Sequence, residues 1–160
     1  MNRSTVGPVR VLVVSHTKTG GTQAMTEAVV AGASHPDIEG VEVVQVAALE
    51  ATPDDVMAAD GYLLGTPENF GYMSGALKHF FDTVYYDCLD HTRGRPYGLF
   101  VRAGNDGTGA VRAVEPLVTG LGWKAVAPPV IAMGELTDDH LESCQELGMT
   151  LAAGLELGIY

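Results

Sequence analysis

Residues 15–22 hold an unusual number of groups that can bind an anion. The segment reads SHTKTGGT and has four hydroxyls, two glycines and one of the three lysines in the chain. Glycines allow the backbone to close around a phosphate, and the free N–H groups at the start of a helix point at it. Hydroxyl donors add hydrogen bonds without formal charge. The segment therefore predicts an anion cradle, although an ordinary turn between a strand and a helix is also rich in Gly and Thr.

Several other kinds of site have no matching pattern. Neither GxxxxGK[ST] nor GxGxxG follows the first apolar run, so a P-loop NTPase and a dinucleotide-binding Rossmann site are not supported. The two cysteines, Cys88 and Cys144, form no metal-ligand spacing, and we expect no metal site. Cys88 and His91 lack a third, orienting group. We therefore predict no catalytic side chain.

Short β-branched runs alternate with longer amphipathic segments along the chain. We predict strands at 9–15, 41–47, 60–66, 97–102 and 124–132, and helices over 21–33, from 52, from 74, over 107–121 and from 137. Capping hydroxyls precede the second, third and fifth helices. Pro116 should break or bend the fourth helix. Pro128 and Pro129 remove hydrogen-bond donors from the last strand, which places it at a sheet edge.

This order of elements predicts where a ligand would bind. Five consecutive βα units indicate an α/β fold with a parallel sheet and helices on both faces. Ligands of such sheets bind outside the carboxyl ends of the strands. The loops after the first, third and fourth strands are therefore the candidate functional segments.

Composition excludes several classes of partner. The 160 residues include 9 basic and 20 acidic ones, for a net charge of −11. Nucleic acids and anionic membrane surfaces need a basic footprint, so neither is an expected partner. The length predicts a single domain over 1–160. The first apolar run is too short for a signal peptide or a membrane span, and we expect a cytoplasmic protein.

The first segment resembles the phosphate loop of flavodoxin-like proteins. Its pattern Thr17-x-Thr19-Gly20-x-Thr22 is similar to the [ST]-x-T-G-x-T of that superfamily. The resemblance implies FMN as cofactor and a three-layer αβα sandwich, with a five-stranded parallel sheet in the order 2-1-3-4-5. It also implies the residues that hold the FMN phosphate or lie beside it, which are Ser15, Thr17, Lys18, Thr19, Gly20, Gly21 and Thr22. Gly21 stands where the family often has Asn, so a backbone N–H must replace one side-chain donor.

The segment after the third strand gives a longer resemblance. Residues 65–75, GTPENFGYMSG, are similar to the G-T-P-x-x-F-G-x-M-S-G segment of WrbA-like quinone reductases in the same superfamily. The resemblance implies that this segment lines the flavin ring, through Thr66, Pro67, Glu68, Asn69, Phe70 and Gly71. Glu68 and Asn69 replace a Thr-Arg pair, so a positive charge near the flavin is lost.

The loop after the fourth strand should close over the pyrimidine side of the flavin. Its expected cofactor contacts are Ala103, Gly104, Asn105 and Gly107. Electron-carrier flavodoxins typically place an aromatic residue here, and this loop has none. The outer flavin face would then be open to a nicotinamide or quinone ring. Alternatively, Phe70, Tyr72 or a residue of a partner chain covers that face.

The resemblance implies an FMN-dependent oxidoreductase that transfers hydride from NAD(P)H through FMN to a quinone or similar acceptor. The alternative is a flavodoxin-like electron carrier without its own substrate, which would dock on a redox protein through its acidic surface. An acidic signalling domain without flavin is a third candidate. Such receiver-type domains need acidic residues where this chain has Ser15 and His16. The acceptor, the choice of NADH or NADPH, and homo-oligomer formation are left open.

Overall fold

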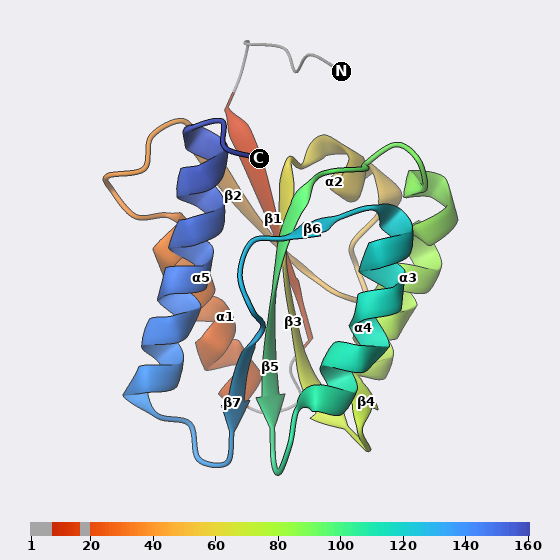
Figure 1. Ribbon diagram of the computed structural model, residues 1–160, viewed down its shortest axis with the longest axis vertical. Coiled ribbons are helices and arrows are strands. Elements are labelled where there is room, and N and C mark those ends of the chain that lie inside the picture. Colours follow the sequence, from red (N-terminus) through yellow and green to blue (C-terminus); the bar gives the residue numbers. More distant parts are fainter. Residues whose placement is uncertain (1–7, 17–19) are drawn as a thin grey trace.

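The strands form one sheet whose order agrees with the sequence prediction. They are β1 (Val9–Ser15), β2 (Val41–Ala47), β3 (Gly61–Asn69), β4 (Tyr72–Met73), β5 (Pro96–Ala103), β6 (Lys124–Ala125) and β7 (Val130–Met133). This is a computed structural model that describes residues 8–16 and 20–160. The order is β2-β1-β3-β5-β6, with β7 also pairing with β5 and β4 with β3 (Figure 1). If β6 and β7 are taken as one interrupted edge strand and the short β4 is set aside, the predicted order 2-1-3-4-5 is confirmed.

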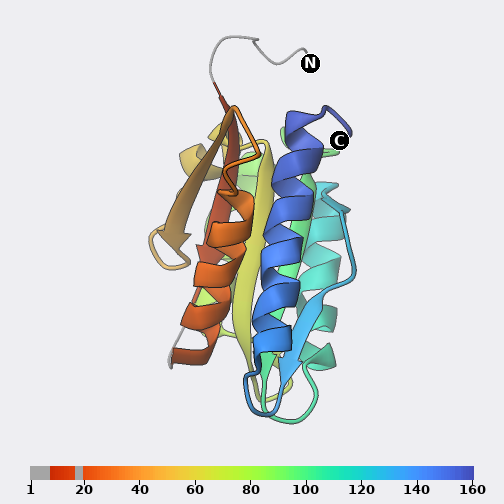
Figure 2. The same ribbon diagram turned by 90° about the vertical axis from the view of Figure 1, so that its left-hand side faces the viewer.

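Helices cover both faces of the sheet and complete the predicted three-layer sandwich. They are α1 (Gly20–Ala33), α2 (Pro53–Ala58), α3 (Gly75–Cys88), α4 (Thr108–Leu121) and α5 (Asp138–Glu156). Helices α1 and α5 lie on one face and α2, α3 and α4 on the other (Figures 1 and 2). Side chains of Thr52, Ser74 and Thr137 cap α2, α3 and α5 as predicted. None of the helices in the described ranges is long and apolar enough to cross a membrane.

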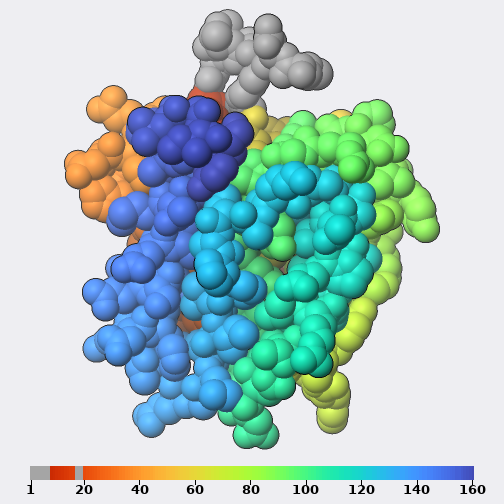
Figure 3. All heavy atoms as spheres, viewed as in Figure 1, coloured from red at the N-terminus to blue at the C-terminus, as the bar shows by residue number. Residues whose placement is uncertain are grey.

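Three expectations about single elements differ from the structure. The strand expected over 124–132 is split into β6 and β7, because Pro128 and Pro129 interrupt the ladder on β5. The gap opens a hollow of about 330 Å³ beside Tyr97 and Glu115, visible between the 126–129 segment and α4 (Figure 3). Helix α4 continues through Pro116, because this residue is exposed and water can reach the carbonyl that loses its donor. Finally, β3 runs on to Asn69 instead of ending at residue 66.

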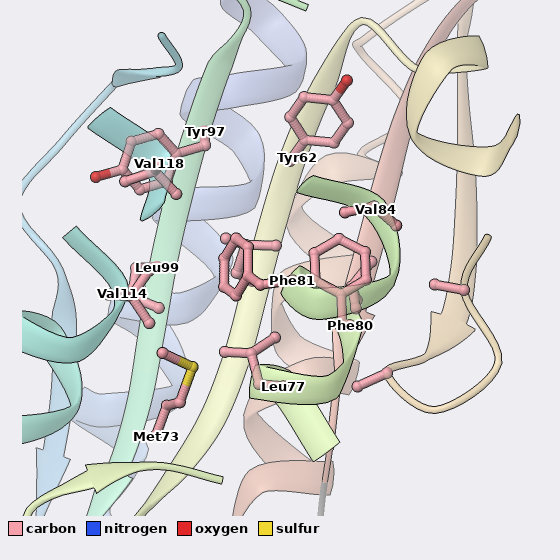
Figure 4. Close-up of a cluster of buried hydrophobic side chains, with 14 of the residues drawn as sticks. Tyr62, Met73, Leu77, Phe80, Phe81, Val84, Tyr97, Leu99, Val114 and Val118 are labelled. Atoms are coloured by element: carbon pink, nitrogen blue, oxygen red, sulfur yellow. The ribbon is translucent and has the colours of Figure 1, made fainter. Parts of the chain in front are cut away.

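The core lies on both sides of the sheet. On the α3 and α4 side, Phe80 and Phe81 of α3 belong to one cluster with Val114 of α4 and side chains from the strands, and Phe81 lies on the α4 side of Phe80 (Figure 4). Tyr62 stacks on Trp123 in the same cluster, with ring centroids 3.9 Å apart. On the α1 and α5 side the cluster includes Phe100. Neighbouring residues of a buried strand pack into opposite clusters, so the central strands are apolar in their middle parts, as in Val11–Val14 and Tyr62–Leu64.

Buried ionisable groups predict a loss of stability in alkali. Burial raises the pKa of the Tyr62 phenol from 10.0 to about 12, and burial raises the pKa of the Cys144 thiol from 9.0 to about 12. Both groups ionise more readily in the unfolded chain, so the stability that they contribute should be constant below about pH 9 and should be lost as the pH rises toward 12. Urea unfolding across this range measures the fall. Cys144→Ala should make the fall shallower without abolishing it, because Tyr62 and Cys88 also have a raised pKa, and a flat curve for the unmodified chain would contradict the prediction.

Candidate functional site

The three predicted loops meet at the carboxyl edge of the sheet, at the bottom of Figure 1. Strand β1 ends at Ser15, which lies opposite Gly65 of β3. Gly65 in turn lies opposite Phe100 of β5. The segments that follow these three strands therefore emerge side by side. Of the predicted site residues, Thr17, Lys18 and Thr19 lie outside the described part of the chain, and the others are at this edge.

The start of α1 forms one side of the edge. Gly20 and Gly21 are its first two residues, and the first turn holds no acidic side chain. A Cβ added at Gly20 would meet nothing within 4 Å. Ser15 and Thr22 are buried, and the Thr26 hydroxyl donates to the Thr22 carbonyl (2.8 Å) and shares a hydrogen bond with the Ser15 hydroxyl (3.1 Å). Among the described residues, nothing fills the space beside Gly20 at the positive end of the helix, while Ser15 fixes the helix to the strand.

The side chain of Arg102 reaches the start of α1, which sequence reasoning missed. A Cβ at Gly21 would lie 2.9 Å from Arg102 Nε. The guanidinium Nη1 donates to the carbonyls of Ala103 (2.7 Å) and Ala132 (3.1 Å). The signal in the sequence was an arginine at the end of a buried strand in an acidic protein. The face of the sheet from which the Arg102 side chain projects depends on the register of β5, which the sequence pattern does not determine.

The residues expected to form a loop after the third strand instead form a β-hairpin between the end of β3 and β4. Glu68 pairs with Met73 and Asn69 with Tyr72. The turn consists of Phe70 (φ 51°) and Gly71 (φ 72°), the left-handed pair of a tight hairpin. A phenylalanine with this φ is uncommon, and its ring is fully exposed at the tip. Phe70 therefore projects beyond the edge of the sheet instead of covering the core.

Thr66 joins this hairpin to α3. Its hydroxyl accepts a hydrogen bond from the Ser74 N–H (2.9 Å) and donates one to the Pro67 carbonyl (2.7 Å). The Ser74 hydroxyl in turn accepts from the N–H of Leu77 at the start of α3 (3.1 Å). The Thr66 side chain is buried and engaged in these bonds, so a role for Thr66 at the cofactor would fall to its backbone.

Glu68 joins the hairpin to the loop after β5. Its carboxylate accepts hydrogen bonds from the N–H groups of Gly107 (3.0 Å) and Ala110 (3.2 Å) at the start of α4. Gly107, the N-cap residue, has no side chain to cap the helix. The hairpin also lies directly on α4, because a Cβ at Gly109 would be 2.1 Å from the carbonyl oxygen of Gly71. The second and third loops are thus held as one unit.

The rest of the third loop is small and polar. Ala103 is buried, while Gly104 and Asn105 are exposed. The Asp106 carboxylate accepts from the N–H (3.3 Å) and the hydroxyl (2.7 Å) of Thr108, and these bonds lower the pKa of Asp106. No aromatic side chain lies in 103–107.

The chemistry available at this edge is binding and orientation. Within residues 8–16 and 20–160, no three His, Cys, Asp or Glu side chains are grouped to hold a metal ion. The groups whose pKa is raised by burial do not belong to the three loops; they are Tyr62, Cys88, Tyr97, Cys144 and Tyr160. The described part of the edge offers an open helix start, an arginine, glycines and backbone N–H groups. This set fits a ligand with a phosphate and a flat, uncharged ring.

Comparisons with known proteins agree with this geometry. Residues 36–138 match the model of the NADPH-dependent FMN reductase family. The chain is 31% identical over 159 residues to a flavodoxin of Aquifex aeolicus, covering 89% of this chain and 85% of that protein. It is 32% identical over 93 residues to an NAD(P)H dehydrogenase (quinone) of Acidithiobacillus ferrooxidans, with 46% of each chain covered.

Solved structures confirm the fold. An archaeal flavodoxin superposes with a TM-score of 0.80 at 21% identity, covering 92% of this chain and 99% of that one. A WrbA-like protein from Agrobacterium tumefaciens superposes with a TM-score of 0.75 at 21% identity, covering 94% and 98% of the two chains. The flavodoxin-like fold predicted from the sequence is therefore correct.

Proposed function

Because this chain belongs to the NADPH-dependent FMN reductase family, we propose that it is an FMN oxidoreductase that moves electrons from NAD(P)H to a quinone or similar small acceptor. FMN, when bound, supplies the two-electron chemistry. The protein's own part is to bind the phosphate, to orient the ring and to limit access to it. The three loops lie on one sheet, so we propose that they act together as a single domain.

The residues proposed to hold the phosphate are at the start of α1. Gly20, Gly21 and Thr22 offer backbone N–H groups at the positive end of the helix. Thr17, Lys18 and Thr19, outside the described residues, complete the proposed phosphate loop. The absence of a Cβ at Gly20 leaves space at the helix start, which supports the fit of a phosphate there.

The residues proposed to flank the flavin ring come from the hairpin and the third loop. They are Thr66, Pro67, Glu68, Asn69, Phe70, Gly71, Ala103, Gly104, Asn105 and Gly107. Since the Thr66 and Glu68 side chains are engaged elsewhere, we assign these two positions a role through the backbone and through the shape of the site. Phe70, exposed at the tip, is free to pack against a ring.

The composition of the third loop is the observation that supports the reductase proposal. With no aromatic residue in 103–107, this side of the site leaves room for a second flat ring beside the flavin. Hydride transfer requires such parallel packing of donor and flavin. An electron carrier needs no such access, because it exchanges single electrons through the exposed edge of its flavin ring.

The second candidate is a flavodoxin-like electron carrier. The 31% identical relative named flavodoxin favours it, as does the net charge of −11, which suits docking on a basic redox protein. The two candidates share the same cofactor and differ in whether NAD(P)H reduces it directly.

One experiment separates the two candidates. The purified chain is loaded with FMN, and its visible absorbance is followed without oxygen as NADPH or NADH is added, and then a quinone. We expect a nicotinamide to bleach the flavin and the quinone to restore it. Bound FMN that is bleached by dithionite but by neither nicotinamide would favour the carrier. A chain that binds no FMN would overturn both candidates.

A further inference from the structure

Arg102 places a positive charge at the carboxyl edge that no carboxylate of the described chain neutralises. The ion pairs found among described residues involve other side chains. Its Nη1 is fixed by the carbonyls of Ala103 and Ala132 at the ends of β5 and β7. Its Nε and Nη2 groups make no hydrogen bond within the described residues. The chain has a net charge of −11, so carboxylates that could pair with an arginine are abundant. An arginine without such a partner among the described residues is therefore unusual here.

Gly21 is what allows this arginine to lie where it does. A Cβ at Gly21 would be 2.9 Å from Arg102 Nε, 3.2 Å from Cδ and 3.3 Å from Cγ. Any larger residue would push the arginine stem away from the first turn of α1. The side chain therefore lies against the first turn of α1, at the end of the helix where the backbone N–H groups point outward. A guanidinium and a helix N-terminus that lie side by side both favour the same kind of ligand, an anion that accepts several hydrogen bonds.

We propose that Arg102 binds the phosphate of the flavin cofactor, and that Gly21 is the residue that admits it. This inference rests on the proposed function and adds a residue that the phosphate loop alone does not contain. At Gly21 the family pattern often supplies an Asn side-chain donor. In this chain the Arg102 guanidinium supplies the hydrogen-bond donors instead, together with a formal positive charge. The remaining N–H groups, one on Nε and two on Nη2, are the ones available to phosphate oxygens.

The proposal predicts that FMN and riboflavin respond differently to changes at Arg102. Riboflavin has the same ring and no phosphate. Arg102→Met should weaken FMN binding about 10-fold or more, as expected for loss of a hydrogen bond to a charged group, and leave riboflavin binding unchanged. Added salt should weaken FMN binding to the unmodified chain more than to Arg102→Met, because the screened charge is then already gone. Both are measured by titrating the apoprotein with each flavin and following flavin fluorescence.

Two further variants distinguish binding from a structural effect. Arg102→Gln keeps a donor for the Ala103 and Ala132 carbonyls without the charge, and should show the same selective loss. Gly21→Ala displaces the arginine stem, so it should weaken FMN less than Arg102→Met does and add nothing in the Arg102→Met background. Arg93→Met is the charge-matched control, because Arg93 is exposed, pairs with Asp90 and contributes to no candidate loop. It should leave both affinities unchanged.

The outcomes that overturn the proposal are distinct from those that overturn the proposed function. Equal weakening of FMN and riboflavin in Arg102→Met, or no weakening of either, would show that Arg102 does not bind the phosphate. An unchanged FMN affinity with a raised KM for NADPH but not for NADH would assign the guanidinium to the nicotinamide's phosphate instead, and the proposal would be wrong. An unmodified chain that binds neither flavin would contradict the proposed function itself.

Discussion

Replacing Gly148 by alanine should lower the free energy of unfolding by about 2 kcal/mol, because overpacking of about 3 kcal/mol outweighs a gain in helix propensity of about 1 kcal/mol. Gly148 lies where α5 crosses α1. A Cβ there would be 2.1 Å from the carbonyl oxygen of Val29 and 2.9 Å from the nitrogen of Ala33. These are backbone atoms, so the two helices must separate to make room. Urea unfolding of the variant and the unmodified chain measures the difference.

The partner position and a control make this prediction specific. Gly32 of α1 faces α5 in the same way, since its Cβ would be 2.0 Å from the carbonyl oxygen of Gln145. Gly32→Ala should therefore be about as destabilising as Gly148→Ala. Gly75→Ala is the matched control, because Gly75 is also helical and a Cβ there meets nothing within 4 Å. It should be neutral or slightly stabilising. Equal stabilities for Gly148→Ala and Gly75→Ala would refute the close crossing.

The helices and the order of the sheet could be predicted because their signals are local. Apolar periodicity and a capping hydroxyl such as Ser74 depend on residues a few positions apart. Even the edge position of the last strand followed from Pro128 and Pro129 alone. The close crossing of α1 and α5 could not be predicted in the same way. The contact of Gly148 with α1 joins segments that are distant in the chain.

The site was predictable in outline and not in its connections. The three loops were expected at one edge, and they are there. The hairpin was missed because its turn puts Phe70, a residue with no preference for a positive φ, in a left-handed conformation. The links that hold the loops together were missed because they join distant residues: Glu68 and Gly107 are 39 positions apart. Charge and spacing alone do not tell which backbone N–H group a carboxylate will meet.

Replacing Glu68 by alanine should release the β3–β4 hairpin from α4. The carboxylate accepts from two N–H groups of the first turn of α4, and its loss should lower the free energy of unfolding by about 2 kcal/mol. Hydrogen exchange of the amides in 66–73 should become faster, because the two hydrogen bonds from helix to hairpin are lost and packing, such as that of Gly71 against Gly109, remains. If FMN binds between these loops, its affinity should fall as well. Exchange measured by mass spectrometry and a flavin titration test the two consequences.

Asp106 is a second carboxylate at the start of α4, and replacing it is the control that distinguishes a role of Glu68 in joining the two loops from a role in capping the helix. Asp106 also accepts hydrogen bonds at the start of α4, but only from Thr108, two residues away. Asp106→Ala removes the same charge from the same helix terminus and should leave exchange in the hairpin unchanged. Gly109→Ala does the converse, since its Cβ would be 2.1 Å from the Gly71 carbonyl oxygen and would push the hairpin away with both carboxylates present. Faster hairpin exchange in Glu68→Ala and Gly109→Ala, but not in Asp106→Ala, is the pattern expected if Glu68 acts by joining two loops. Similar exchange in the Glu68 and Asp106 variants would mean that Glu68 only caps the helix.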